Sequence, residues 1–93
     1  MNYSLYRRSS FKRDYRRCIK RGYDVELIHE ALRQLSQNGT LPKKYHAHQL
    51  KGTYTHFWEC HIQPDWLLIY SIDHASKKIF LTRTGTHSDL FDE

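Results

Sequence analysis

Cysteine is scarce in this sequence. Only Cys18 and Cys60 occur, far apart and without a CxxC spacing, so the chain has no disulfide framework, and two free thiols are typical of a reducing compartment. Long apolar runs are also missing: none approaches the roughly 20 residues that a membrane-spanning helix needs, and residues 1–4 lack the apolar core of a signal peptide. We therefore expect a cytoplasmic protein without a membrane partner.

Acidic residues are in the minority. Ten Asp and Glu oppose 15 Lys and Arg, which leaves a formal net charge of +5. Such a charge favours a polyanionic partner, either nucleic acid or an acidic protein segment. Hydrophobic residues make up 39% of the 93 residues, which is enough for one small core but not for two, so we expect a single domain over residues 1–93.

The N-terminal part predicts a short strand at residues 3–6 and then a strongly basic helix. Apolar residues recur at helical spacing from Ser9 or Ser10, either of which can cap a helix, to Gly22. Only Asp14 opposes a dense run of cations, namely Arg7, Arg8, Lys12, Arg13, Arg16, Arg17, Lys20 and Arg21. Such a run is either a solvated helix face or a surface that meets phosphates or an acidic partner, and its density favours the second interpretation.

A second helix and a long loop are predicted next. Asp24 is a good N-cap, an apolar stripe follows, and Asn38 with Gly39 ends the pattern. Residues 40–54 have no clear period, so we expect a loop there. It is longer than a simple connection needs, and such loops are often functional.

The C-terminal part has the patterns of strands. We expect strands at residues 57–62, 66–72 and 78–82, with the last one broken at Thr84 and Gly85. Thr86 and Asp89 have the spacing of a capping box, which predicts a short terminal helix over residues 86–91. The fold class is therefore α/β of the α+β kind, in the order βααβββα, with an antiparallel meander and a two-helix hairpin on one face.

A candidate site lies at the turn between the first two of these three strands. Pro64 separates the strands, and residues that flank such a turn approach each other across the strand pair. His61 and Asp65 are therefore expected to meet at one end of the sheet. Taken alone, the pair is explained better by an ordinary strand histidine and an ordinary turn-forming aspartate, because Pro-Asp turns are common.

More chemistry converges on the same region. The end of the last strand delivers Arg83, His87 and Phe91, and the loop before residue 57 can bring His48 there. Imidazoles suit the transfer of protons near neutral pH, and a guanidinium suits a phosphate that gains negative charge. This set of groups predicts metal-free cleavage of an RNA phosphodiester.

A zinc site is the alternative. His46, His48 and His61, with Cys60 or Asp65 nearby, are possible ligand types, but no CxxC or HxxxH framework positions them. A serine or cysteine nucleophile is also disfavoured, because no nucleophile elbow is present. We therefore expect no metal and no other cofactor.

Three segments resemble a known family. ECHIQPDWLLIY at residues 59–70 and RTGTHSDLF at residues 83–91 are similar to the two signature segments of YafQ-type toxins, in the RelE/ParE superfamily of bacterial toxin–antitoxin modules. HQLKG at residues 48–52 is similar to a third, of the form HxLxG. With the basic first helix, the resemblance spans nearly the whole chain.

The resemblance implies a small fold with a curved antiparallel sheet and a ribosome-dependent endoribonuclease that cuts mRNA in the A site. It also implies a cognate antitoxin that neutralises the toxin, with operator DNA bound only through the toxin–antitoxin complex. The implied site consists of His48, His61, Asp65, Arg83, His87 and Phe91.

Roles can be assigned to this implied set. His87 is expected to be the general acid, His48 or Asp65 the base, and Arg83 the phosphate ligand, although acid and base can be exchanged. Phe91 is expected to stack on a base or to shape its pocket. The cations of the first helix, with Lys43 and Lys44, would bind ribosomal RNA.

Two other functions compete with this hypothesis. A ParE-like protein has the same fold but inhibits DNA gyrase by binding, without a catalytic acid or base. A nucleic-acid-binding or antitoxin-binding module with a decayed site is the other alternative. The presence of His48, His61, Asp65 and His87 together argues against both.

Overall fold

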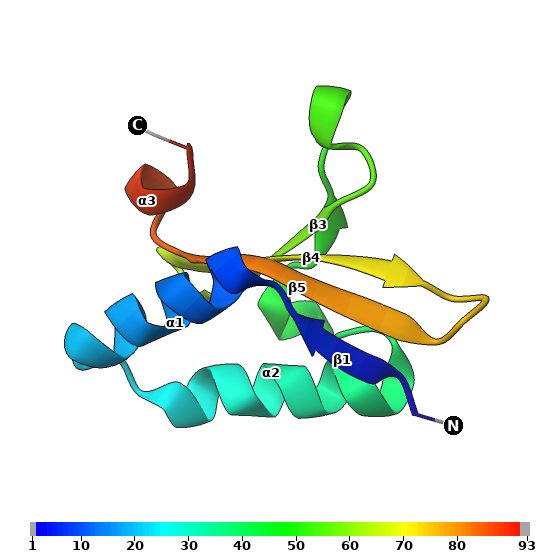
Figure 1. The fold of residues 1–93 in the computed structure, drawn as a ribbon, viewed down its shortest axis with the longest axis horizontal. Coiled ribbons are helices and arrows are strands. Elements are labelled where there is room, and N and C mark those ends of the chain that lie inside the picture. Colours follow the sequence, from blue (N-terminus) through cyan, green and yellow to red (C-terminus); the bar gives the residue numbers. More distant parts are fainter. Residues whose placement is uncertain (1, 92–93) are drawn as a thin grey trace.

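A five-stranded sheet organises the fold, with α2 beneath it and α3 above it in the view of Figure 1. The structure is a computed structural model that describes residues 2–91. Its strands are β1 (Ser4–Arg7), β2 (His48–Gln49), β3 (Trp58–Gln63), β4 (Trp66–Asp73) and β5 (Lys78–Gly85). Its helices are α1 (Ser9–Lys20), α2 (Val25–Asn38) and α3 (His87–Phe91), and the short 3₁₀ turns η1 (Lys43–Tyr45) and η2 (Gly52–Tyr54) lie between α2 and β3. The predicted α+β class is confirmed.

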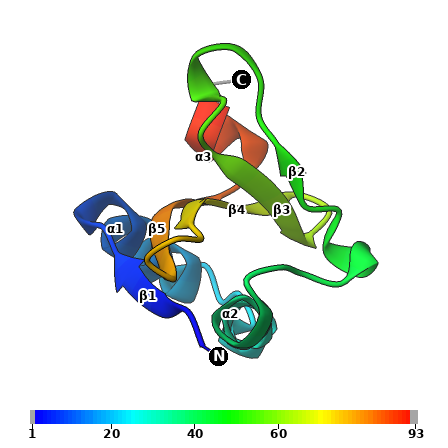
Figure 2. The same cartoon turned by 90° about the vertical axis from the view of Figure 1, so that its right-hand side faces the viewer.

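The sheet has the strand order β1-β5-β4-β3-β2, which can be followed from left to right in Figure 2. The pairs β3–β4 and β4–β5 are antiparallel, as predicted, and β2, which was not predicted, is antiparallel to β3. The outer strand β1 departs from the antiparallel prediction, because it pairs with β5 in parallel, with Ser4 opposite Lys78. Hydrophobic alternation indicates a strand but not the direction of its neighbour, so the sequence pattern did not contain this information.

Helix α1 begins differently from the prediction. Arg8 occupies the N-cap position in an extended conformation and makes no side-chain cap bond, because a guanidinium has no acceptor atom. Its backbone N–H continues the strand by donating to the carbonyl of Leu81, at 3.0 Å. The expectation that Ser9 or Ser10 caps the helix is therefore wrong. The Ser10 hydroxyl instead donates to the carbonyl of Thr82, at 2.6 Å, and so ties α1 to the edge of β5.

Helix α2 follows its sequence signals closely. Asp24 accepts a hydrogen bond from the N–H of Glu26, at 3.1 Å, and Gly39 ends the helix in the left-handed conformation with φ of +69°, so both predicted boundaries are confirmed. The loop predicted at residues 40–54 contains structure of its own, namely η1, η2 and the two-residue strand β2. This strand adds an edge to the sheet beside β3.

Strand β5 is longer than predicted and continues through Gly85. Thr84 is fully buried in it: its N–H donates to the carboxylate of Asp14, at 3.1 Å, and its hydroxyl accepts from the indole N–H of Trp66, at 2.9 Å. These partners lie on α1 and β4, so tertiary contacts extend a strand that the local pattern ends. The capping box of α3 is confirmed, because Thr86 and Asp89 exchange two hydrogen bonds.

The hydrophobic core lies between the sheet and the helices α1 and α2. Its buried side chains are Tyr3, Phe11, Cys18, Ile28, Ala31, Leu32, Leu35, Tyr45, Cys60, Trp66, Leu68, Tyr70, Ile79 and Leu81. The alternation of β3 directs Cys60 into this core, and therefore places its neighbours Glu59 and His61 on the opposite face of the sheet. Among residues 2–91, no helix is long and apolar enough to cross a membrane.

Candidate active site

The turn between β3 and β4 holds the start of α3. Asp65 accepts a hydrogen bond from the backbone N–H of His87, at 2.9 Å, and its Oδ1 lies 2.5 Å from Nδ1 of the same residue. These two contacts lower the pKa of Asp65, with the backbone N–H as the larger cause. Because an ionised carboxylate only accepts, Nδ1 of His87 carries the proton, and Nε2 is the nitrogen that can gain or lose one. Asp65 was expected beside His61, and the structure pairs it with His87 instead.

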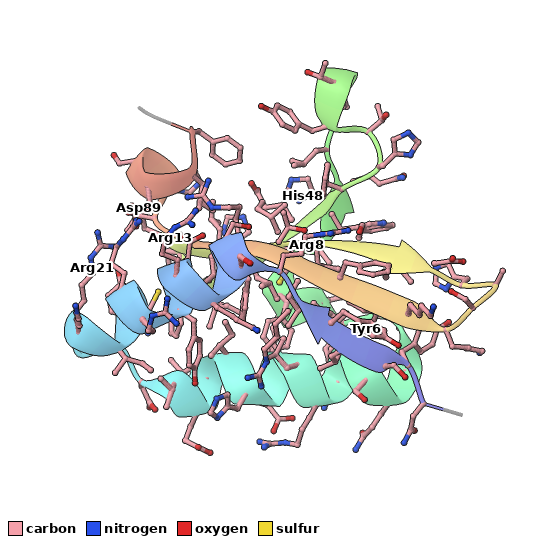
Figure 3. The ribbon with its side chains drawn as sticks, in the orientation of Figure 1. Tyr6, Arg8, Arg13, Arg21, His48 and Asp89 are labelled. Carbon is pink, nitrogen blue, oxygen red and sulfur yellow. The ribbon has the colours of Figure 1, made fainter. Side chains whose placement is uncertain are left out.

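A second carboxylate lies between two other imidazoles. Glu59 is buried, with 7% of its surface exposed, and its Oε1 is 3.3 Å from Nε2 of His48 and 3.8 Å from Nε2 of His61. Figure 3 shows His48 between the sheet and the η2 turn. Glu59 is not among the predicted site residues, although the alternation in residues 57–62 places it on the same face as His61.

The Nδ1 contacts of His48 and His61 determine which ring nitrogen carries the proton in each imidazole. Nδ1 of His48 lies 2.9 Å from the carbonyl of His46, and Nδ1 of His61 lies 3.3 Å from the carbonyl of Pro64. A carbonyl only accepts, so both Nδ1 atoms are protonated, and each Nε2 is an acceptor while its ring is neutral. A hydrogen bond between His48 and Glu59 therefore requires an additional proton, held by either the imidazole or the carboxyl group.

The three imidazoles form a row. The ring centroids of His48 and His61 are 6.4 Å apart, and those of His61 and His87 are 6.1 Å apart. The structure thus brings together three histidines from β2, β3 and α3, as the sequence predicts. His46 also approaches His61, at 6.1 Å between ring centroids, but its carbonyl rather than its ring contacts His48.

Arg83 lies on the same face of the sheet. Pairing registers place His48 opposite Glu59, Glu59 opposite Ile69, and Ile69 opposite Arg83. Residues aligned across neighbouring strands point to the same side, and strands are about 4.8 Å apart, so Arg83 is roughly 10 Å across the sheet from Glu59. A bulge at Thr82, where Ile69 pairs with Arg83 but Tyr70 pairs with Leu81, produces this register.

Asp14 fixes the orientation of Arg83. This carboxylate on α1 is 1% exposed and accepts hydrogen bonds from Nε and Nη2 of Arg83, at 2.6 and 3.3 Å. The contact raises the pKa of the guanidinium, and it uses only one edge of the fork-shaped group. In the sequence, Asp14 stands out only as the one acid among many cations, so this structural role was not predicted.

An apolar pocket of about 150 Å³ adjoins Arg83. Its walls are Leu50, Tyr54 and Phe57 from the segment around η2, Ile69, Thr82 and Arg83 from the sheet, and Leu90 and Phe91 from α3. Tyr54 and Phe91 remain 56% and 36% exposed, which leaves aromatic surface open for stacking. Phe91 therefore lies where the sequence analysis expects a base-binding residue, and Tyr54 is an aromatic partner that it did not identify.

The predicted cations differ in their surroundings. Arg17 and Arg21 form ion pairs with Asp89 on α3. The rest of the predicted group is exposed and forms no ion pair within residues 2–91: Arg7, Arg8, Lys12, Arg13, Arg16 and Lys20, with Lys43 and Lys44 on η1. The exposed members can meet an external polyanion without breaking an ion pair, although Arg8 lies over the ring of Phe80 and Lys44 over that of Tyr45.

The zinc alternative does not fit this geometry. Cys60 is buried on the core side of β3, where burial raises its pKa to about 12, so its thiol is not available as a ligand beside the histidines. In the part of the chain that the structure describes, no group of three or more His, Cys, Asp or Glu side chains is arranged to hold a metal ion.

The sequence and fold match characterised proteins. A family model described as the bacterial toxin of type II toxin–antitoxin systems, YafQ, matches residues 3–92. The chain is 33% identical over 82 residues to the mRNA interferase toxin YafQ of Escherichia coli K12, and this match covers 87% of each protein.

Two solved structures illustrate the likeness of fold. A chain of the E. coli DinJ-YafQ toxin–antitoxin complex has 29% identity and a TM-score of 0.87, over 98% of this chain and 99% of that one. A copper-bound mutant toxin from Helicobacter pylori has 33% identity and a TM-score of 0.88, over 98% of this chain and 100% of that one.

Proposed function

This chain belongs to the YafQ family of type II toxins, and from that premise we propose that it is an mRNA interferase, an endoribonuclease that stops translation by cutting mRNA. We propose further that it works in the cytoplasm on mRNA in the ribosomal A site, that a cognate antitoxin neutralises it, and that it reaches operator DNA only through that antitoxin. The observation that carries the proposal is the row of three imidazoles, each beside a carboxylate, on the same sheet face as an arginine.

The geometry supports general acid–base attack by the 2′-hydroxyl. The 2′-oxygen forms a bond to the adjacent phosphorus, and the bond from phosphorus to the 5′-oxygen breaks, which gives a 2′,3′-cyclic phosphate and a 5′-hydroxyl. His87 would protonate the leaving 5′-oxygen from Nε2, because Asp65 holds its Nδ1 proton. Since Asp65 is engaged by two groups of His87, the base role falls to His48 with Glu59.

Arg83 and the neighbouring pocket would bind the substrate. Asp14 holds one edge of the guanidinium, so the other edge can donate to the phosphate as its charge grows. The pocket between Tyr54 and Phe91 would accept one base of the cleaved codon by stacking. The exposed cations of α1 and η1 would contact ribosomal RNA, and this contact would weaken as salt rises.

The critical experiment maps the 5′ ends of mRNA after the protein is added to a translating extract, and compares them with those in the same extract from which ribosomes have been removed. We expect codon-aligned cuts that His87→Ala reduces by about 10²-fold or more, while antitoxin binding persists. His74→Ala is the matched control, because His74 contacts Tyr3 in a turn outside the site, at 2.8 Å, and should cut normally. An unchanged rate for His87→Ala removes that residue from the mechanism, and inhibition of supercoiling without any RNA cut favours the ParE-like alternative.

A further inference from the structure

Helix α3 is attached to α1 by one carboxylate. Asp89 accepts two hydrogen bonds from the guanidinium of Arg21, from Nη1 at 2.6 Å and from Nη2 at 3.0 Å. Nη1 of Arg17 lies 3.3 Å from the same carboxylate. Figure 3 shows Arg21 and Asp89 facing each other across the gap between the two helices. A bidentate pair of this kind fixes orientation as well as distance.

The same carboxylate also determines where α3 starts. Oδ2 of Asp89 accepts from the N–H of Thr86, at 2.9 Å, and the N–H of Asp89 donates to the Thr86 hydroxyl, at 3.1 Å. Gly85 lies beside this carboxylate with φ of +151°. A Cβ atom added at Gly85 would clash with Oδ2 of Asp89, at a distance of 2.7 Å. The start of α3 and its attachment to α1 therefore depend on one side chain.

Helix α3 is short and only partly covered by the rest of the molecule. It contains five residues, and none of them is buried, whereas an isolated helix of that length does not persist in water. Polar contacts at two points contribute to its position, Asp65 with His87 on one side and Asp89 with α1 on the other. Both residues that α3 contributes to the proposed site, His87 and Phe91, move if the helix moves.

The arginines also connect α3 to the phosphate ligand of the proposed site. Nη2 of Arg17 lies 3.6 Å from Asp14, and Asp14 orients Arg83. Two carboxylates and three arginines thus alternate in the order Arg83, Asp14, Arg17, Asp89, Arg21. Through these contacts, α1 fixes the positions of both Arg83, the phosphate ligand, and the helix that carries His87, the general acid.

We propose that Asp89, Arg17 and Arg21 form a clamp that positions α3, so that His87 and Phe91 are held at the site from α1. The inference rests on the proposed nuclease function and adds three positioning residues to it. It also gives Arg17 and Arg21 a role different from that of the exposed cations on α1, because these two arginines form ion pairs with Asp89 rather than with RNA phosphates.

The variant Asp89→Asn distinguishes an effect on the position of α3 from an effect on RNA binding. The amide can still accept the N–H of Thr86, but it loses the ion pairs, and the substitution makes the protein more positive. Ribosome affinity should therefore stay the same or rise, while kcat falls roughly tenfold because the general acid is displaced. KM should not increase. Arg33→Met is the matched control, since it removes an arginine–carboxylate pair of 2.6 Å on α2 and should leave kcat unchanged.

Arg21 tests the same contact from the other helix. We expect Arg21→Met to lower kcat as Asp89→Asn does, and the double variant Arg21→Met with Asp89→Asn to be no slower than either single variant. Arg21→Lys should restore only part of the rate, because lysine keeps the charge but not the bidentate fork. Amide exchange at residues 87–91 should accelerate in both single variants while exchange in β4 does not, which shows release of α3 without loss of the fold.

The outcomes distinguish the two proposals. If the unmodified protein cuts no RNA, the nuclease function itself fails. If it cuts RNA and His87→Ala cuts as fast, His87 is not the general acid and the clamp has no catalytic residue to hold. If His87→Ala is inactive but Asp89→Asn and Arg21→Met both keep normal kcat and normal amide exchange, the clamp is overturned and the proposed function stands. If Asp89→Asn does not fold, the comparison of Arg21→Met with Arg21→Lys decides the matter.

Discussion

Replacing Asp14 by asparagine is expected to destabilise the protein strongly for a change of one atom. The carboxylate is 1% exposed and accepts three hydrogen bonds, two from Arg83 and one from the N–H of Thr84. Asparagine keeps the shape but presents an NH2 group to partners that are all donors. One or more of these donors must then lose its acceptor, and the N–H of Thr84 is buried and cannot reach water.

The size of the effect follows from the exposure of the partners. A hydrogen bond to a charged group contributes about 1.5–3 kcal/mol, and breaking a fully buried ion pair costs about 3–5 kcal/mol. The side chain of Arg83 is 33% exposed, so water can replace part of the hydrogen bonding that Arg83 loses. The lower end of the range for a hydrogen bond to a charged group therefore applies. We expect a loss of about 2 kcal/mol in the free energy of unfolding, which for a domain of this size lowers Tm by roughly 10 °C.

Urea and thermal unfolding followed by circular dichroism measure this loss. Asp24→Asn is the control, because it makes the same chemical change at an exposed N-cap where asparagine is equally suitable. It should alter the free energy of unfolding by less than about 0.5 kcal/mol. If Asp14→Asn is as mild as this control, the buried carboxylate is not the organising contact described above.

Three further outcomes are expected. Gly85→Ala should lower both Tm and the cleavage rate, because its Cβ would meet the Asp89 carboxylate; a variant that keeps both values contradicts the close approach. Burial raises the pKa of Cys60 to about 12 and also raises that of Cys18, so iodoacetamide at pH 8 should modify them in urea but scarcely in the folded protein, and rapid labelling without urea would refute this. Replacing Arg13 and Arg16 by glutamine should reduce the salt dependence of ribosome binding, with the slope of log K against log salt smaller by about two; equal slopes would show that these cations do not contact phosphates.

Local signals in the sequence predict most of the fold. The cap at Asp24, the stop at Gly39 and the capping box at Thr86 each depend on residues within one or two turns, and all three occur in the structure. The parallel pairing of β1 with β5 does not have such a signal, because it joins residues 4–7 to residues 78–81. The extension of β5 to Gly85 likewise depends on contacts with α1 and β4.

The histidines of the candidate site are easier to find than the carboxylates that hold them. His48, His61 and His87 belong to motifs that the family resemblance identifies. Glu59 is visible only through alternation with His61. Asp14 occupies a position in register with Phe11 and Cys18 on the apolar stripe of α1, so its spacing alone indicates burial, yet its charge leads to the opposite interpretation. A lone acid on the apolar stripe of a basic helix is thus a signal of an internal partner.

The pairing of β1 with β5 also affects how the protein is made. Strand β1 cannot pair until β5 has been synthesised, because Ser4 lies opposite Lys78. Contacts between such distant segments form late and slowly. A nascent polypeptide that has emerged only as far as β4 holds two of the three imidazoles but neither the arginine nor the last histidine. Under the proposed mechanism, a growing chain would lack its general acid and its phosphate ligand until residues 78–91 have been added and have docked.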